Sequence, residues 1–364
     1  MKIKKIISII EEWAPLDYSE DFDNVGLLTG DKEKKCSGIL ITLDTNELVI
    51  NEAVRKNCNF ILSFHPIIFP HIKKITYKNY VEKTLVKAIK NDISIYSIHT
   101  ALDNYKYGVS HKIGDRLGLI NQKILIPKKN TLIKLNVNIP IDHYEKVKNQ
   151  LFISGAGEIG NYKKSSFTLK GIGQFSGNEK SNPYIGDKKK NIKIDEKQLN
   201  LIFQKHKKNK ILKKLKEVHP YEEVSYEIYS IQNINEEIGM GSLGYLKNSM
   251  NSEEFLKFLK IKMNTKLIRH SKLIKKKIKK IAVLGGSGSF AIESAIQKKA
   301  DVLITADLKY HDFFKANNKI ILMDIGHYES EQYTKKLIFD HLTKKIPSFA
   351  CVLSRVKTNP INYY

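Results

Sequence analysis

The sequence predicts an α/β protein in which two α/β halves are interrupted by an inserted α+β domain. Strand and helix patterns alternate near both ends of the chain, and the hydrophobic rhythm changes between them. We expect the first half at residues 1–127, the insert at 128–247 and the second half at 248–364. A chain of 364 residues also exceeds the size at which one hydrophobic core usually stops growing.

The first half alternates short apolar runs with amphipathic stretches. Strand patterns cover 38–44, 60–63 and 93–98, and helical spacing of apolar residues covers 47–56 and 81–90. Strands that follow one another through helices indicate a mostly parallel sheet with helices on its faces.

The middle of the chain has a different pattern. Apolar and polar residues alternate at 132–137, 167–169 and 225–229, which is typical of half-buried antiparallel strands. Residues 177–197 are rich in Gly, Asn, Ser and Lys, so we expect a mobile loop there. We expect a lysine-rich helix at 199–216.

The α/β alternation returns in the last part of the chain. Strands are predicted at 280–284, 301–305 and 320–324, and helices at 290–298 and 331–344. The second half therefore resembles the first in its alternation, as expected when one domain receives another within its chain.

Composition excludes several classes of protein. The net charge of +24 comes almost entirely from lysine, whereas arginine is favoured for base and phosphate recognition. Solvated lysine surfaces are therefore favoured, and a nucleic-acid partner is not expected. Apolar runs stay well below the ~20 residues that a membrane helix needs, so we expect a cytoplasmic protein without a membrane partner. The three scattered cysteines form neither a disulfide framework nor a CxxC metal motif.

Histidine and acidic residues follow several of the predicted strands. His327 and Glu331 are spaced i and i+4 after the strand at 320–324, His65 follows the second strand, and Asp103 follows the third. Ligand sites of open α/β sheets lie beyond the carboxyl ends of strands. Imidazole nitrogens and carboxylate oxygens suit Zn, Mn, Fe or Mg, so these segments together predict a divalent-metal site.

Each of these residues alone has a structural interpretation as well. The His327–Glu331 pair could be a surface salt bridge, and His65 or Asp103 could end a strand or form a turn. His99 is either a proton carrier or partner of a metal ligand, or a hydrogen-bonded histidine at the sheet end.

Two further polar segments have alternatives of their own. The glycine-rich stretch at 285–289 is either a phosphate-binding turn or a tight turn without a ligand. For residues 219–223 (HPYEE) we favour a structural or interface role over a second metal site, and we expect His219 to begin the strand at 225–229.

The order of these motifs resembles the GTP cyclohydrolase I type 2 family, also called NIF-three-like, over essentially the whole chain. The matching stretches are 23–28 (DNVGLL), 63–66 (SFHP), 99–103 (HTALD), 285–288 (GGSG), 305–312 (TADLKYHD) and 326–331 (GHYESE). Residues 155–162 (GAGEIGNY) and 219–223 resemble the CutA/PII-like domain, of ferredoxin-like α+β fold, that long bacterial members carry as an insert.

The resemblance implies a two-metal centre inside a toroidal homohexamer. His65, Asp103 and Glu331 would hold one metal, and His327 with a shared Glu331 would hold the other. The family pattern has two adjacent histidines, and Phe64 stands where the first belongs. We therefore expect one firmly bound divalent cation and a second that is weak or absent.

The resemblance also implies a metal-dependent hydrolase acting on GTP or a related nucleotide, with His99 or His311 moving protons. The alternative is a non-catalytic metal-binding or regulatory homo-oligomeric assembly, which the loss of a ligand at Phe64 favours. A nucleic-acid scaffold is the third and lowest-ranked hypothesis. Whether the protein is an enzyme stays open at the level of sequence.

Overall fold

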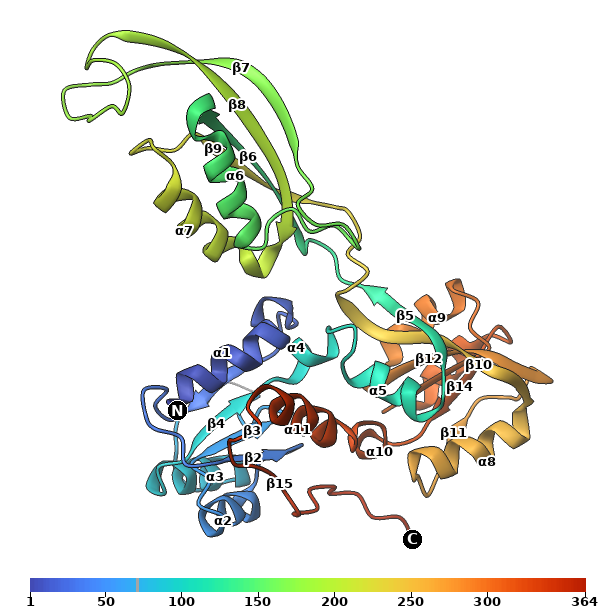
Figure 1. Cartoon of the computed structure of the whole chain (residues 1–364). Helices are drawn as coiled ribbons and strands as arrows, with labels where there is room; N and C mark the ends of the chain where they lie inside the picture. Colours follow the sequence, from blue (N-terminus) through green and yellow to red (C-terminus); the bar gives the residue numbers. More distant parts are fainter. Residues whose placement is uncertain (70–71) are drawn as a thin grey trace. The chain divides into compact units, whose positions relative to one another are not determined.

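The computed structural model describes residues 1–69 and 72–364, which divide into two compact units (Figure 1). Residues 1–127 and 236–364 form the discontinuous unit, and residues 128–235 form the inserted unit. Within the described residues, no helix has the length and apolar character required to cross a membrane.

The first sheet of the discontinuous unit has the strand order β1-β4-β3-β2-β15. Its strands are β1 (Gly26–Thr29), β2 (Ile39–Thr42), β3 (Phe60–Ser63), β4 (Ser94–Ser97) and β15 (Cys351–Leu353). All neighbours pair in parallel except β1, which runs antiparallel to β4. The three predicted strands of the first half are confirmed, and a strand from the end of the chain completes their sheet.

Helices cover both faces of this sheet, as its continuously apolar strands require. Helices α1 (Ile3–Trp13) and α11 (Thr334–Lys345) pack on one face. Helices α2 (Glu47–Arg55) and α3 (Tyr80–Lys90) pack on the other. Each of the last two begins at an asparagine whose side chain accepts a backbone N–H of the first turn, a cap that contributes about 1 kcal/mol.

The second sheet of this unit has the order β11-β14-β13-β12-β10-β5. Its strands are β5 (Ile120–Pro127), β10 (Gly239–Asn251), β11 (Arg269–His270), β12 (Lys277–Ser287), β13 (Val302–Ala306) and β14 (Ile321–Asp324). Strands β12, β13 and β14 are parallel, and the remaining pairs are antiparallel. Because β10 pairs with β5 and β12, residues 236–247 belong to this unit, and the inserted unit ends at 235 rather than at the expected 247.

Helices also cover both faces of the second sheet. Helices α5 (Val109–Arg116) and α8 (Ser252–Met263) pack on one face, whereas α9 (Ile292–Gln297) and the 3-10 helix η5 (Tyr310–Ala316) pack on the other. Successive residues of β12 alternate between the two cores, with Ile281 and Val283 in the first and Ala282 and Leu284 in the second. This alternation is the period-2 geometry of a strand that is buried on both faces.

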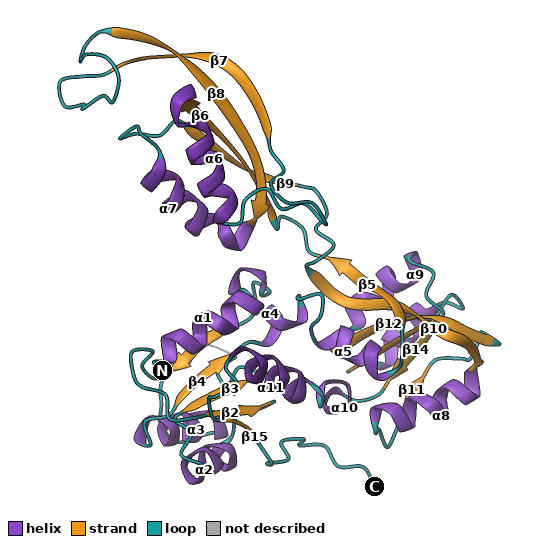
Figure 2. Cartoon of the chain, viewed as in Figure 1, coloured by secondary structure: helices purple, strands orange, loops and turns teal. Residues whose placement is uncertain are grey.

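The inserted unit is a four-stranded antiparallel sheet in the order β7-β8-β6-β9, with two helices on one face (Figure 2). Along the chain its elements are β6 (Leu132–Pro140), α6 (Tyr144–Ile153), β7 (Phe167–Ser176), β8 (Asn191–Gln204), α7 (Lys208–Val218) and β9 (Tyr226–Ile231). The sequence of elements is therefore βαββαβ.

Two expectations for the insert are wrong. Strand β8 occupies residues 191–204, where we expected the end of a loop and the start of a lysine-rich helix. The reason is the alternation of Leu199, Leu201 and Phe203, which are all buried and place one face of β8 on the core. His219 does not begin a strand either, because it ends α7 and β9 starts only at Tyr226.

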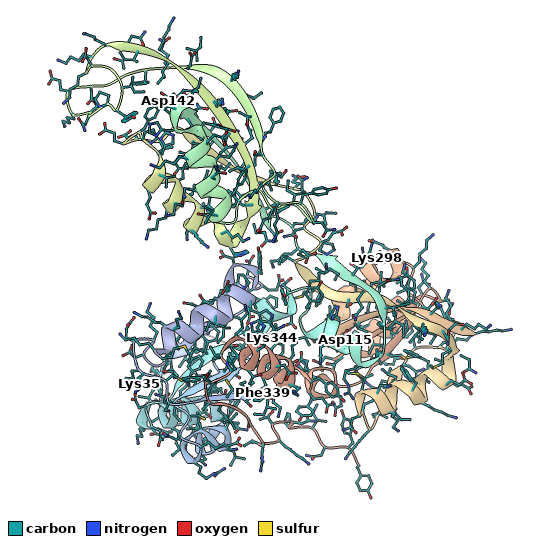
Figure 3. The ribbon with its side chains drawn as sticks, viewed as in Figure 1. Lys35, Asp115, Asp142, Lys298, Phe339 and Lys344 are labelled. Carbon is teal, nitrogen blue, oxygen red and sulfur yellow. The ribbon has the colours of Figure 1, made fainter. Side chains whose placement is uncertain are left out.

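Lysine side chains are spread over the surfaces of both units rather than gathered at one site. Lys35, Lys298 and Lys344, for example, are exposed and lie in three separate parts of the discontinuous unit (Figure 3). This distribution agrees with solvated lysine surfaces.

Candidate metal centre

The carboxyl ends of the parallel strands in both sheets of the discontinuous unit meet at one cavity of about 350 Å³. His65 follows β3, helix α4 (His99–Asp103) follows β4, and helix α10 (His327–Glu331) follows β14. Each segment is held by its strand, so residues far apart in sequence reach the same place. The site therefore has the position that ligands take in open α/β sheets.

Two imidazoles and one carboxylate converge in this cavity. Nε2 of His65 and Nε2 of His327 each lie 3.1 Å from the same atom, Oε2 of Glu331. One ligand atom from each of the three residues lies within 4.8 Å of the others. Glu331 is buried, with only 3% of its surface exposed, so solvent contributes little to stabilising its charge.

A second carboxylate lies behind each histidine. Oδ1 of Asp44 is 2.9 Å from Nδ1 of His65, and Oδ2 of Asp307 is 2.6 Å from Nδ1 of His327. When Nδ1–H donates to a carboxylate, the lone pair of Nε2 points away from it and toward the cavity. Carboxylates placed in this way orient the histidine ligands of many metal sites and make them more basic.

The convergence leaves a buried oxygen unsatisfied. Oε2 of Glu331 has no aligned hydrogen-bond donor among the residues that the structure describes. A neutral imidazole held by Asp44 or Asp307 presents a lone pair to this oxygen, which is repulsive unless a metal cation or a proton on Nε2 lies between them. The donor set of two nitrogens and one carboxylate oxygen fits Zn, Mn or Fe, and it accommodates Mg less well.

The pKa values of the three residues show how protons balance the charge without a cation. Burial lowers the pKa of His65, but its contacts with Asp44 and Glu331 outweigh this effect and raise it to about 10. Burial also lowers the pKa of His327, whereas Asp307 and Glu331 raise it to about 11. For Glu331, burial raises the pKa, but His327 and His65 lower it to about 2. A cation would displace protons from both histidines on binding.

Asp103 lines the same cavity but is not one of the three converging groups. Burial and then the charge of Glu331 raise its pKa well above the usual range. A carboxyl group that is protonated for this reason becomes an available anionic ligand once a cation offsets the charge of Glu331. The structure thus brings all four predicted ligands to one cavity, and Asp103 lies outside the group of three that converge.

Gly286 makes room for Glu331. Its φ is +68°, and a Cβ atom at this position would lie 2.4 Å from Oε1 of Glu331, so a side chain is excluded on both grounds. The backbone N–H groups of Gly285, Gly286 and Gly288 donate to Ser110, Ser330 and Ala306, respectively. The glycine-rich stretch therefore makes room for Glu331, and these three amides are not free to bind phosphate.

His99 lies beside the converging groups without joining them. Its ring centroid is 5.1 Å from that of His65, and its Nδ1 is 2.8 Å from Oδ1 of Asp23. Burial raises the pKa of Asp23, but the hydrogen bond and the charge of His99 together with bonds from Thr100 make the net effect a lowering. His99 is thus a positioned imidazole at the cavity wall with an ionised partner.

Known proteins resemble this chain over its full length. The sequence profile of Duf34/NIF3 (NGG1p interacting factor 3) matches residues 1–360. The chain belongs to the Duf34/NIF3 family. A protein of Halalkalibacterium halodurans named GTP cyclohydrolase 1 type 2 homolog is 35% identical, over 98% of both chains, and one of Bacillus subtilis with the same name is 32% identical. A crystal structure of a Bacillus cereus protein related to NIF3 is 32% identical and superposes with a TM-score of 0.85, over 100% of this chain and 99% of the other.

The remaining predicted site residues of this NIF3 protein lie in different environments. Phe64 is fully buried in the core of the first sheet, and its ring meets His99 edge-on at 5.4 Å. His311 is exposed and packs against Tyr310 and Phe314, outside the cavity that holds the other histidines. We therefore assign no proton-transfer role to His311.

The orienting carboxylates are the functional residues that sequence reasoning missed. In the sequence, Asp44 is the last residue of the strand pattern at 38–44 and Asp307 lies in the stretch 305–312, and neither position is assigned a role. Both stand directly at strand ends, after β2 and β13, as the ligand segments do. Strand-end position was therefore the signal that would have found them, whereas local spacing gave none.

Proposed function

We propose that this NIF3 protein binds one divalent cation through His65, His327 and Glu331, with Asp103 available as a fourth ligand. The observation that carries the proposal is the approach of two Asp-oriented Nε2 atoms to one buried carboxylate oxygen. A surface salt bridge would need neither the burial of Glu331 nor the carboxylates behind both histidines.

Titration of metal-free protein with Mn²⁺ and Zn²⁺ tests this proposal by calorimetry and by metal analysis after dialysis. We expect one equivalent of tightly bound cation in the natural protein and none in His65→Ala. His270→Ala is the matched control, because His270 is exposed on β11 and lies outside the cavity. Equal binding by His65→Ala and the natural protein would refute the site.

We further propose a hydrolase that acts on GTP or a related nucleotide, an activity suggested by the name of the relatives. A divalent cation at this site would supply a hydroxide-like water at neutral pH. His99 would hold and move the proton at its Nε2, since Nδ1 is already bound to Asp23. The exposed rings of Phe22 and Phe69, 6.4 Å apart at the cavity rim, would stack on a nucleobase.

The test of catalysis separates the cation from the proton carrier. Metal-loaded protein is incubated with a nucleotide panel, and formate and altered nucleotide are measured. We expect His99→Ala to keep its bound cation and to lose about 10²- to 10⁴-fold in turnover, the usual share of general acid–base catalysis. Unchanged turnover in His99→Ala would remove this residue from the mechanism.

A non-catalytic metal-binding assembly remains the second candidate because of Phe64. Its ring occupies a fully buried position in the core, so the position that would supply a second metal with a ligand offers no donor atom. Cation binding without turnover of any nucleotide in the panel would favour this candidate over the hydrolase.

The proposal also covers the oligomeric state of the protein and the fold type of its insert. We infer a homohexamer and an insert of the CutA/PII type, for which the βαββαβ order and the antiparallel sheet provide support. Strand β7 lies at the edge of that sheet and exposes Phe167, Leu169 and Ile172, as a strand that packs on another subunit would. Light scattering of the purified protein measures the oligomer directly, and a monomer would overturn this part.

A further inference from the structure

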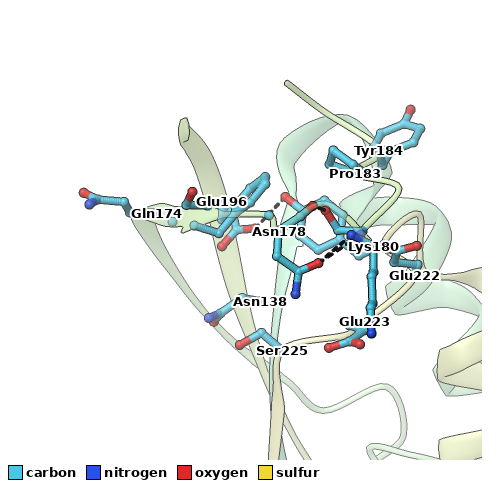
Figure 4. A pocket seen from close by; sticks show the side chains of 16 residues that line it. Asn138, Gln174, Asn178, Lys180, Pro183, Tyr184, Glu196, Glu222, Glu223 and Ser225 are labelled. Carbon is cyan, nitrogen blue, oxygen red and sulfur yellow. Dashed lines mark hydrogen bonds between the residues drawn. The ribbon is translucent and has the colours of Figure 1, made fainter. Parts of the chain in front are cut away.

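The inserted unit contains a cavity of its own, with a volume of about 810 Å³. Its wall is formed by the end of β7, the connection from β7 to β8, and the segment between α7 and β9 (Figure 4). All of its lining residues belong to the inserted unit. The volume lies in the range of sites for small organic molecules and far exceeds the space that a single ion requires.

A buried carboxylate is the central polar group of this cavity. Glu196 on β8 is only 8% exposed, and its Oε1 accepts a hydrogen bond of 2.8 Å from the hydroxyl of Tyr221. No residue in the described part of the chain donates a hydrogen bond to its Oε2. One oxygen of the carboxylate is thus held in place by Tyr221, and the other is an acceptor that is open to the cavity.

The backbone of the neighbouring strand is shaped for this carboxylate. A Cβ atom on Gly173 of β7 would lie 2.3 Å from Oε2 of Glu196, closer than any real contact. The φ of Gly173 is outside the left-handed region, so its backbone conformation does not itself require glycine. The missing side chain therefore serves to leave space over the strand for the carboxylate.

Three aromatic side chains line the same cavity as the carboxylate. Phe175 packs beside Tyr221 with ring centroids 5.9 Å apart, and Tyr184 is fixed by a contact of 2.8 Å between its hydroxyl and Nε2 of His143. Burial and then Glu196 raise the pKa of Tyr221, so its hydroxyl stays a donor throughout the physiological range. Aromatic faces close to a carboxylate are the usual surroundings of bound organic cations.

The charge of the lining agrees with a cationic ligand. Glu222 and Glu223 add two carboxylates to that of Glu196, and Lys180 is the one basic side chain among the described residues of the wall. An acidic wall is unexpected on a chain with a net charge of +24. A metal ion fits less well, because within the described residues the sole group of three ligands close enough to hold one is His65, His327 and Glu331.

We propose that this cavity binds a small organic cation through a primary ammonium group, which donates to Oε2 of Glu196 and lies against the rings of Tyr221 and Phe175. The remaining volume would hold the rest of the molecule, with Glu222 and Glu223 near a second positive group. This site belongs to the inserted unit and is independent of the metal centre.

Calorimetric titration of the full-length protein with 1,5-diaminopentane tests the proposal, with 1,5-pentanediol as the uncharged probe of the same length. We expect saturable binding of the diamine and none of the diol. Glu196→Gln keeps the shape of the side chain and its acceptor for Tyr221. It should lower the affinity for the diamine about 10- to 100-fold, which corresponds to one charge-assisted hydrogen bond. Gly173→Ala should also lower the affinity for the diamine, because the added methyl group displaces the carboxylate of Glu196.

Matched variants keep the result interpretable. Glu145→Gln removes an exposed carboxylate of the same unit that pairs with Lys148, and it should bind the diamine as the natural protein does. Glu223→Gln alters the exposed rim of the cavity and tests the site if either buried variant fails to fold. Absence of binding at millimolar diamine, equal binding of the diol, or binding that none of the Glu196, Gly173 and Glu223 variants changes would overturn the proposal.

Discussion

The cavity at the strand ends and the cavity in the insert both contain a buried carboxylate, but the two carboxylates have different neighbours. Glu331 faces two imidazole nitrogens, each with a further carboxylate behind it, in about 350 Å³. Glu196 faces a tyrosine hydroxyl and open space, in about 810 Å³. The first arrangement concentrates lone pairs on one point, whereas the second leaves one acceptor free beside aromatic faces.

This difference indicates what distinguishes a metal centre from other acidic cavities. The insert cavity has three acidic residues in its wall, yet none of the described residues that line it is a histidine. The deciding feature is the pair of orienting residues, Asp44 and Asp307, which fix both histidines with their lone pairs inward. We therefore expect ligand selectivity in the two cavities to depend on hydrogen-bond orientation more than on charge.

The largest effect on cation affinity should come from replacing Glu331, whose Oε2 both histidines approach. Glu331→Gln removes the charge that both histidines face, so cation affinity should fall by more than the ~100-fold that loss of an outer partner can cost. Diamine binding in the insert should not change. Calorimetry with Mn²⁺ and with the diamine measures both, and Glu293→Gln, at an exposed position of α9, is the control. Loss of both Mn²⁺ binding and diamine binding would mean that the two cavities are coupled.

The next largest effect should come from the orienting carboxylates. Asp44→Asn and Asp307→Asn keep an acceptor for the imidazole but lose its charge, and each should weaken cation binding about 10- to 100-fold. Asparagine tolerates the positive φ of +56° at position 307, so strain should not confound that variant. Unchanged cation affinity in both variants would show that Asp44 and Asp307 do not determine cation binding, and the proposed difference between the two cavities would fail.

A change of stoichiometry should follow from Phe64→His. The family resemblance assigns a histidine to this position, and a second imidazole beside His65 would supply the missing ligand of a second cation. We expect metal content to rise from one to two equivalents per chain, with a cost of about 1–3 kcal/mol to metal-free stability from burying a polar ring. Metal analysis and thermal unfolding measure the two parts, and Phe64→Leu controls for lost packing. A single equivalent in Phe64→His would contradict the prediction.

The smallest effect is expected away from both cavities, at His341. This residue stacks on Trp13 with ring centroids 4.0 Å apart, and burial, then Lys345 and Lys344, lower its pKa to about 4. An unfolded histidine titrates near pH 6.5, so the unfolded state takes up the proton first, and stability falls as pH decreases from about 6.5 toward 4.

His341→Phe removes this proton linkage and keeps a stacked ring. The loss of melting temperature between pH 7 and pH 5 should be about 2–4 °C smaller in the variant, because roughly 1 kcal/mol shifts a large domain by that amount. Fluorescence of Trp13, the single tryptophan of the chain, reports unfolding at this position. An identical pH dependence in both proteins would show that His341 is protonated in the folded state as well.

Sequence patterns predicted the parts of the fold in which local and tertiary preferences agree. Strands β2, β3, β4, β13 and β14 are fully buried, as are residues 281–286 of β12, and the segments that follow several of these strands line one cavity. Strand β8 was missed because its first half is mostly polar, with alternating exposed and half-buried residues, and is paired with β7 along residues 191–200. The composition of this segment is typical of a loop, and it forms a strand because it pairs with β7.

The grouping within the site could not be obtained from sequence. The family resemblance placed His327 with a second metal, whereas in the structure it meets His65 at one oxygen of Glu331. Which ligands share an atom depends on how the two sheets of the discontinuous unit meet, and no local pattern encodes that. Asp44 and Asp307 were missed for the same reason, because each acts across the cavity edge on a residue 20 or 21 positions away.

The pairing of β15 with β2 has a consequence for the order in which the protein is made. Residues 351–353 complete a sheet whose other strands lie within residues 26–97, and Thr358 donates to Asp44 behind His65. During synthesis, the sheet that positions His65 therefore waits for almost the whole chain to emerge from the ribosome. The four strands of the insert lie between residues 128 and 235 and need no later segment. The insert can thus become a folded unit while the metal centre is still in separate pieces, so a truncated chain would retain the insert cavity and lack the cation site.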